Sequence, residues 1–186
     1  MSIPAQLQRY LKKQKLKFDV VEHKTIYTAY DLAQTTKEKL QAVAKTLVLK
    51  VHEPKKLSDD PQEQKGIHHV LAVLPAHVRV DLAKVKKLLG AKKVTIASEK
   101  EVAQATKGEA GAQTPFGGHH RLKVVMDAGL RKVGHALFGA GSFTHSLRLK
   151  VKDFERSEQP VTGAIAEKPK RKKERNENQT SAHHPR

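Results

Sequence analysis

Three short segments carry residues whose types and spacing could do chemistry. Lys45 precedes an apolar run, where its ammonium could hold a phosphate or a developing oxyanion, or simply extend into solvent. The segment GAQTPFGG (111–118) is glycine-rich, which allows sharp turns and lets a ligand approach main-chain N–H groups. FGAGSFTHSLRL (138–149) places two glycines before a predicted strand. A surface loop and a β-bulge are the alternative interpretations of these two glycine segments.

Metal and thiol chemistry fit the sequence poorly. The chain has no cysteine, which excludes disulfides, a thiolate nucleophile and cysteine-bound zinc. The eleven histidines include the doublets His68–His69, His119–His120 and His183–His184, which lack the four-residue helical spacing that brings two imidazoles to one metal. The sequence contains neither a G-x-S-x-G elbow nor a P-loop. We therefore expect no metal and no cofactor.

The charge of the chain points to a polyanionic partner. The formal net charge is +17, of which +4 falls on residues 164–186 and +13 on residues 1–163. A body this basic attracts polyphosphates through counterion release, which favours RNA or another polyanion over merely solvated lysines. Lysines interrupt the N-terminal 17 residues, and no apolar run approaches the ~20 residues of a membrane helix. We expect a cytoplasmic protein that does not contact a membrane.

Apolar spacing predicts an irregular alternation of helices and strands. Helices are expected at 4–16, 30–43, 81–89 and 98–106, with Asp81 as an N-cap and Ser98 and Glu101 as a capping box. Strands are expected at 18–22, 45–51, 70–74, 93–97, 122–126, 136–138 and 147–151. Residues 52–66 read as an exposed hairpin loop, 108–120 as irregular chain, and 153–156 as a closing helical turn.

This order of elements predicts the fold class and the domain boundary. Some neighbouring strands have no helix between them, which argues against a doubly wound parallel sheet. We expect an α/β (mixed α+β) fold in which flanking helices cover a mixed, mostly antiparallel sheet. A single domain should span residues 1–158, because apolar patterning ends there. Residues 159–186 read as a basic, disordered tail that contains KPKRKKER.

An ordered set of segments resembles a known family. HKTIYTAYDLAQ (23–34), VAKTLVLKV (43–51), the stretch 71–102, GAQTP (111–115) and the stretch 124–156 are similar, in that order, to the YbaK/prolyl-tRNA-synthetase-associated editing domain. The YTA opening and the FGAGS segment look closest to its free-standing bacterial branch. The resemblance implies a single domain whose pocket receives the 3′ end of a mischarged aminoacyl-tRNA and hydrolyses the ester in trans.

The same resemblance implies which residues form the site. Catalytic roles would fall to Lys45, Gly111 and His145, with Lys45 holding the tRNA terminus and the 111–115 loop holding the ester carbonyl. Close relatives often carry a histidine directly after the late Gly-Ser, where this chain has Phe143. If this segment is a regular strand, Phe143 and His145 share a face, and His145 could substitute for that imidazole. The implied substrate-binding residues are His23, Tyr27, Thr28, Ala112, Gln113, Thr114, Pro115, Phe116, Gly117, Gly141, Ser142, Phe143 and Thr144.

Other functions stay open at this point. The departure at Phe143 motivates a non-catalytic tRNA-binding or RNA-binding module that keeps the fold without turnover. A further alternative is a general nucleic-acid-binding protein that acts through its basic body and tail. The sequence does not identify the edited amino acid or the tRNA, and a monomer or weak dimer is expected.

Overall fold

The computed structural model describes residues 3–54 and 66–167. Its helices are α1 (Ala5–Lys13), α2 (Ala29–Thr36), α3 (Leu82–Leu89), α4 (Glu99–Thr106), α5 (Gly117–His120) and α6 (Val151–Glu158), with 3-10 turns η1 (Leu40–Ala42) and η2 (Ala128–Lys132). Its strands are β1 (Asp19–Glu22), β2 (Ala44–His52), β3 (Ile67–Pro75), β4 (Arg79–Val80), β5 (Lys93–Ile96), β6 (Lys123–Asp127), β7 (His135–Gly139), β8 (His145–Lys150), β9 (Val161–Gly163) and β10 (Ala166–Glu167).

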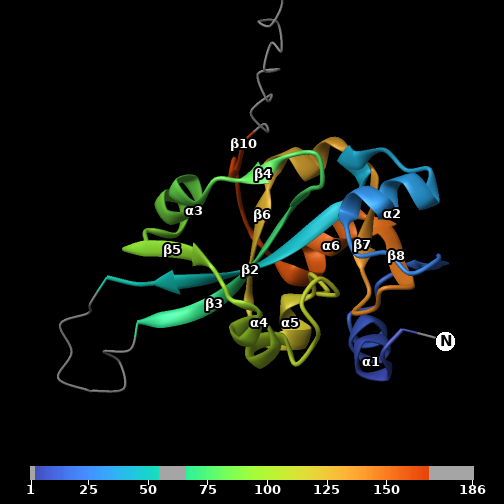
Figure 1. Cartoon of the computed structure of the whole chain (residues 1–186), viewed down its shortest axis with the longest axis horizontal. Helices are drawn as coiled ribbons and strands as arrows, with labels where there is room; N and C mark the ends of the chain where they lie inside the picture. Colours follow the sequence, from blue (N-terminus) through green and yellow to red (C-terminus); the bar gives the residue numbers. More distant parts are fainter. Residues whose placement is uncertain (1–2, 55–65, 168–186) are drawn as a thin grey trace, which may run out of the picture.

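The antiparallel pair β2–β3 forms the centre of the larger sheet. That sheet has the order β5-β2-β3-β6-β9, and β6 joins β3 in parallel (Figure 1). The run Val70–Leu74 is fully buried because β3 lies between two hydrophobic clusters, with Leu71 and Val73 in one and Val70 and Ala72 in the other. Among the strands of the described residues, five pairings are antiparallel, and β3–β6 and β6–β9 are parallel. The predicted mixed, mostly antiparallel sheet with flanking helices is therefore confirmed.

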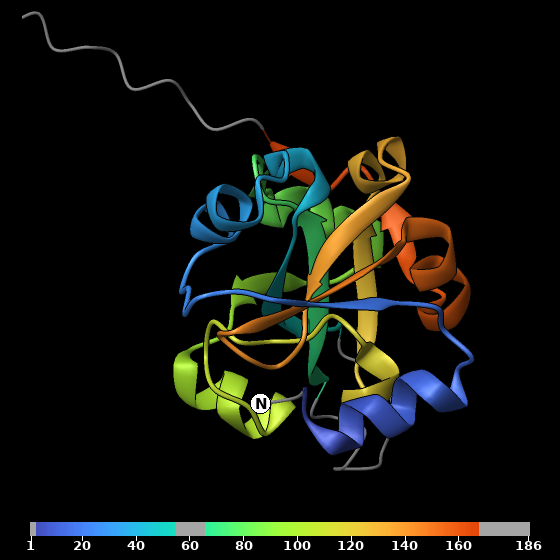
Figure 2. The ribbon, with the colours of Figure 1, turned by 90° about the vertical axis from the view of Figure 1, so that its right-hand side faces the viewer.

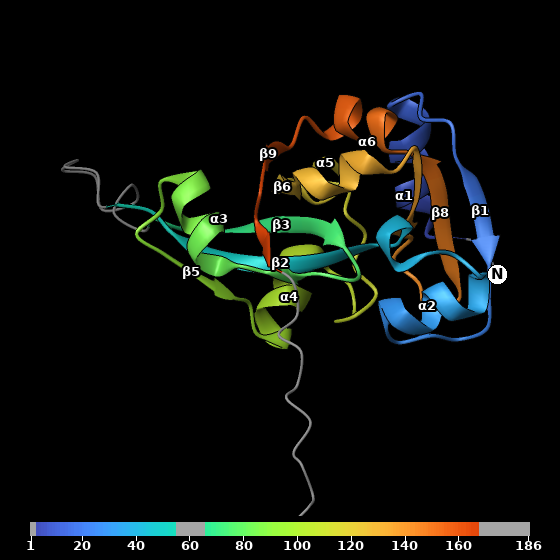
Figure 3. The same cartoon turned by 90° about the horizontal axis from the view of Figure 1, so that it is seen from above.

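A smaller sheet packs at one end of the molecule. Its order is β1-β8-β7, and Figure 3 shows β1 and β8 at the end opposite α3 and β5. A parallel bridge between Val43 and Leu137 connects the two sheets. Phe138 of β7 stacks on Phe154 of α6 with ring centroids 4.8 Å apart, and Phe116 meets Phe154 edge-on at 5.6 Å. These three fully buried rings fix β7 and the chain before α5 in one core.

The predicted N-caps begin α3 and α4. The Asp81 carboxylate accepts hydrogen bonds from the N–H groups of Ala83 and Lys84 at 3.0 and 3.1 Å. Ser98 and Glu101 form the capping box, and Lys50 donates to the Glu101 carboxylate at 2.6 Å. The hydrogen bonds from Lys50 and Ser98 lower the pKa of Glu101 to about 2. The start of α4 is thus tied to the central strand β2.

Two predicted elements differ from the structure. The expected helix 30–43 stops at Thr36, where Lys37 adopts a left-handed conformation, and resumes only as the turn η1. The segment 108–120, expected to be irregular, ends in the short helix α5. The β2–β3 pairing confirms the predicted hairpin, whose tip at residues 55–65 lies outside the described residues. In the described ranges, no helix is long and apolar enough to cross a bilayer.

The folded body extends past the expected boundary at residue 158. Strand β9 pairs in parallel with β6, and β10 pairs with β4. Ile165 is fully buried, and its N–H donates to the Asp127 carboxylate at 2.9 Å. Residues 161–167 therefore belong to the domain, which corrects the tail assignment for this part. The remaining tail, 168–186, lies outside the described residues.

Replacing Ile165 by alanine tests this corrected boundary. The change removes a fully buried side chain from the cluster around Val85, so we expect the free energy of unfolding to fall by about 2–4 kcal/mol. Val161→Ala is the control, because Val161 is 41% exposed in the same segment. Urea unfolding measures both. An Ile165→Ala variant as stable as the control would contradict the boundary.

Candidate functional site

A cavity of about 780 Å³ opens between the N-terminal end of α1, the end of α4 and two glycine-containing loops. Figure 2 shows α1 and α4 at the base of the molecule, with the chain leading into α5 between them. The size suits a small-molecule or nucleoside ligand. The residues that line it are Pro4, Ala5, Gln6, Leu7, Gln104, Ala105, Thr106, Lys107, Gly108, Glu109, Ala112, Gln113, Thr114, His119, His120, Arg121, Gly141, Ser142 and Phe143.

Main-chain contact joins the two loops of the cavity. Gly139 ends β7, and a Cβ atom there would overlap the carbonyl oxygen of Gln113. Gly111 has φ +93°, a conformation that favours glycine, and a Cβ there would lie 3.4 Å from the Phe143 ring. The Gln113 side chain donates to the Glu109 carbonyl at 2.8 Å and accepts from the Gly111 N–H at 3.1 Å. The loop 109–114 is therefore held by its own hydrogen bonds and by β7.

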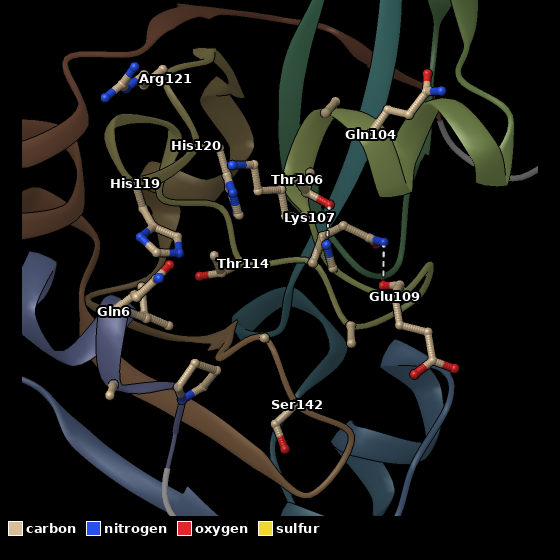
Figure 4. Close-up of a pocket in the computed structure, with 18 of the residues that line it drawn as sticks. Gln6, Gln104, Thr106, Lys107, Glu109, Thr114, His119, His120, Arg121 and Ser142 are labelled. Carbon is tan, nitrogen blue, oxygen red and sulfur yellow. Dashed lines mark hydrogen bonds between the residues drawn. The ribbon is translucent and has the colours of Figure 1, made fainter.

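Polar side chains converge on the cavity from opposite sides. In Figure 4, His119 and His120 project from one side, Lys107 and Glu109 lie on the other, and Thr114 lies between them. Thr114 is buried, and its Oγ1 has no hydrogen-bond partner among the described residues. A buried hydroxyl without a partner is unfavourable, so a ligand or water that bonds to it would be stabilised.

The histidine doublet is neutral in its surroundings. Burial, and then the neighbouring His119, lower the pKa of His120 to about 4. Burial also lowers the pKa of His119, an effect that the Glu158 carboxylate opposes. The same carboxyl group of Glu158 accepts from the Tyr10 hydroxyl at 2.8 Å and from the Gly118 N–H at 3.0 Å. At neutral pH these imidazoles are uncharged, and the buried His120 Nε2 has no hydrogen-bond partner among the described residues.

The charged groups at the cavity favour an anionic ligand. Lys107 and Arg121 are exposed, and Glu109 is the one carboxylate among the lining residues. Ser142 Oγ lies 3.1 Å from Thr144 Oγ1 and accepts from the Thr144 N–H at 3.1 Å. Within the described ranges, Ser142 is thus bonded to Thr144 of its own loop, and no histidine or carboxylate is its hydrogen-bond partner. The arrangement suits hydrolysis by a positioned water better than attack by a serine.

Lys45 is not among the residues that line this cavity. Its Nζ donates to the main-chain carbonyl oxygens of Ala76 and Val78, in the turn between β3 and β4. Burial, and then the charge of Arg79, lower the pKa of Lys45. An ammonium has three donors, so one donor remains beyond these two carbonyl contacts.

The late motif differs from regular strand alternation. Phe143 precedes β8, whereas His145 is its first residue, so the two side chains do not share a strand face. His145 is buried, and its Nδ1 lies 2.9 Å from Thr144 Oγ1. Phe143 lines the cavity and His145 does not. The expectation that His145 replaces an imidazole at the position of Phe143 therefore has no support from this geometry.

The structure brings together only part of the predicted site. Ala112, Gln113, Thr114, Gly141, Ser142 and Phe143 line the cavity. Pro115, Phe116 and Gly117 are buried. Thr28 caps α2 by accepting from the Asp31 N–H, and His23 Nε2 lies 3.0 Å from Ser146 Oγ. Sequence reasoning missed Gln6, Thr106, Lys107 and the His119–His120 doublet, which it weighed only as a metal site.

Comparisons with known proteins agree with the resemblance seen in the sequence. Residues 23–157 match the family described as the aminoacyl-tRNA editing domain. The multifunctional Ser/Thr-tRNA deacylase ProXp-y of Escherichia coli is 31% identical over 152 residues, which cover 81% of this chain and 84% of that protein. The prolyl-tRNA editing protein ProX of Acetoanaerobium sticklandii is 26% identical over 107 residues, 58% of each chain. A crystal structure of a candidate trans-editing enzyme for prolyl-tRNA synthetase superposes with a TM-score of 0.71 at 21% identity, covering 89% of this chain and 99% of that one.

The lowered pKa of His120 predicts a pH-dependent stability. The unfolded chain protonates this histidine below about pH 6.5, whereas the folded protein does so only near pH 4. Between these two values the unfolded chain binds more protons than the folded protein. The free energy of unfolding is therefore highest above pH 6.5 and decreases as the pH falls towards 4. We expect the melting temperature of wild type to fall more between pH 7 and pH 4.5 than that of His120→Gln. His135→Gln, at an exposed site, should keep the wild-type slope. An equal fall in melting temperature for all three proteins would contradict the lowered pKa of His120.

Proposed function

Since the chain belongs to the aminoacyl-tRNA editing domain family, we propose that it is a hydrolase that removes amino acids from mischarged tRNA in trans. The observation that carries the proposal is the cavity formed by the 109–114 loop and residues 141–143, within the part of the chain that matches the family. Its volume of about 780 Å³ can receive the aminoacyl-adenosine end of a tRNA. Cytoplasmic localisation is part of the proposal, because aminoacyl-tRNA is used there.

The proposed reaction needs no protein nucleophile. A water molecule, or water assisted by the ribose 2′-hydroxyl of the substrate, attacks the ester carbonyl carbon. The ester bond to the ribose oxygen then breaks and that oxygen takes up a proton, which leaves a free amino acid and a tRNA with a free hydroxyl. The 111–115 loop would hold the carbonyl while charge develops on its oxygen. The N–H groups of Gly111 and Ala112 are bonded inside the loop, which leaves those of Gln113 and Thr114 as our candidate donors.

We assign Lys45 to the tRNA terminus rather than to the cavity wall. Its ammonium is partly buried and has Arg79 nearby, and together they form a compact cationic position. Such a position suits a phosphate of the unpaired 3′ end, because lysine binds phosphate as a point charge. Lys107 and Arg121 at the cavity would provide further cationic contacts. Binding should therefore weaken as the salt concentration rises.

Deacylation of a panel of tRNAs tests the proposed function. tRNAs charged with Ala, Ser, Thr, Cys or Pro are incubated with the full chain, and the released amino acid is measured. Selective release from a mischarged tRNA would establish editing and identify its substrate. Tight, salt-dependent tRNA binding without release from any of them would instead support a non-catalytic module. Two observations favour this second function. Phe143 lines the cavity, and the Lys45 ammonium already donates to a main-chain carbonyl.

Lys45→Ala should lower kcat/KM for deacylation by about 10- to 100-fold, because a hydrogen bond to a charged group such as a phosphate contributes ~1.5–3 kcal/mol. The matched control is Lys50→Ala, which removes a lysine from the same strand, where it is paired with Glu101 at 2.6 Å. Both variants should keep the wild-type far-UV circular dichroism. Turnover of Lys45→Ala equal to that of Lys50→Ala would remove Lys45 from the mechanism.

Gly139→Ala should displace the loop that holds the ester. The added methyl group overlaps the Gln113 carbonyl oxygen, so β7 and the loop must separate. A displacement of ~1 Å at a reacting group can cost about 100-fold in rate, and we expect a loss of that order. Gly134→Ala is the control, because its Cβ would meet nothing within 4 Å. Normal turnover of Gly139→Ala would argue against the loop as the catalytic element.

A further inference from the structure

Two aromatic side chains lie next to each other beside the cavity. Tyr27 is 70% exposed, and its ring centroid lies 5.1 Å from that of Phe143 with the planes tilted by 51°. A tyrosine this exposed gains little from packing in the folded protein. An exposed aromatic ring therefore stands ready to stack on a flat ligand.

Main-chain hydrogen bonds hold this pair in place. The His23 N–H donates to the Thr144 carbonyl at 2.9 Å, and the Ile26 N–H donates to the Phe143 carbonyl at 3.0 Å. These bonds join the segment that carries Tyr27 to the loop that carries Phe143. The main-chain positions of Tyr27 and Phe143 are consequently held relative to each other, which lowers the entropic cost of bringing the two rings to one ligand.

Phe143 connects the aromatic pair to the proposed catalytic loop. It lines the cavity, and its ring edge lies beside Gly111, where a Cβ would be 3.4 Å from the ring. Phe143 thus lies between the cavity that it lines and the exposed ring of Tyr27. A chain that leaves the cavity on the side of Phe143 passes over these rings.

We propose that Tyr27 and Phe143 form a stacking platform for the unpaired bases at the 3′ end of tRNA; this rests on the function proposed above. Every nucleobase has a π-face, so stacking holds the 3′ end without regard to sequence. This suits a site that must accept the same terminus from different tRNAs. The exposed Lys24, three residues before Tyr27, adds a cation close to the phosphates of the same strand.

The test measures binding of uncharged tRNA with an intact 3′ end, and of the same tRNA lacking its last three nucleotides. Tyr27→Ala should weaken binding of the intact tRNA about tenfold, within the range found for loss of one base–aromatic stack, and should leave binding of the shortened tRNA unchanged. Tyr27→Phe keeps the ring and should bind like wild type. Phe143→Leu keeps apolar bulk against Gly111 but loses the aromatic face, so it should repeat the loss.

Tyr30→Ala is the matched control. Tyr30 is also exposed, at 56%, but its hydroxyl accepts from Gln34 on the same helix and its ring is outside the pair. The platform is overturned if Tyr27→Ala binds the intact tRNA as tightly as wild type does, as Tyr30→Ala should, or if it loses the same affinity for both tRNAs. Because the tRNA is uncharged, the result does not depend on catalysis. If the protein releases no amino acid but Tyr27→Ala still weakens binding of the intact tRNA alone, the proposed hydrolase activity is rejected and the stacking platform is supported.

Discussion

The close approach of β7 to the Gln113 carbonyl is the contact on which the site depends. Gly139 leaves room for it, since any side chain there would overlap that oxygen. Phe138, the residue before it, is locked into the core against Phe116 and Phe154. The position of the loop is thus set by aromatic packing several residues away. A rigid scaffold of this kind lets a loop hold a reacting group in a fixed geometry without a nucleophile of its own.

Local signals in the sequence predicted much of the fold. The caps at Asp81 and at Ser98 with Glu101 act within a few residues, so they can be read without tertiary information. The three residues of β9 carry no such signal, because they become a strand only by pairing with β6. Ile165 is likewise buried only because the chain returns to Asp127. The apolar pattern of the sequence therefore placed the end of the domain too early, at residue 158.

The candidate site was less predictable, for a physical reason. Glycines at 111, 139 and 141 indicated close approach, and the loops that contain them do meet at the cavity. Which side chains face that cavity depends on turns rather than on periodicity. Phe143 and His145 separate because the strand begins only at His145. The short helix α5 places His120 at the cavity, and this helix was not predicted. The low pKa of His120 follows from its burial, which the sequence does not reveal.

The most direct test of the account is the location of the bound substrate end. Backbone amide shifts of the isotopically labelled protein would be recorded while a non-hydrolysable aminoacyl-adenosine analogue is added. The account predicts that the largest changes fall on residues 109–115 and 141–143, the two loops of the cavity. Changes confined to another surface, such as the hollow formed by Arg131, Lys150 and Glu155, would contradict it.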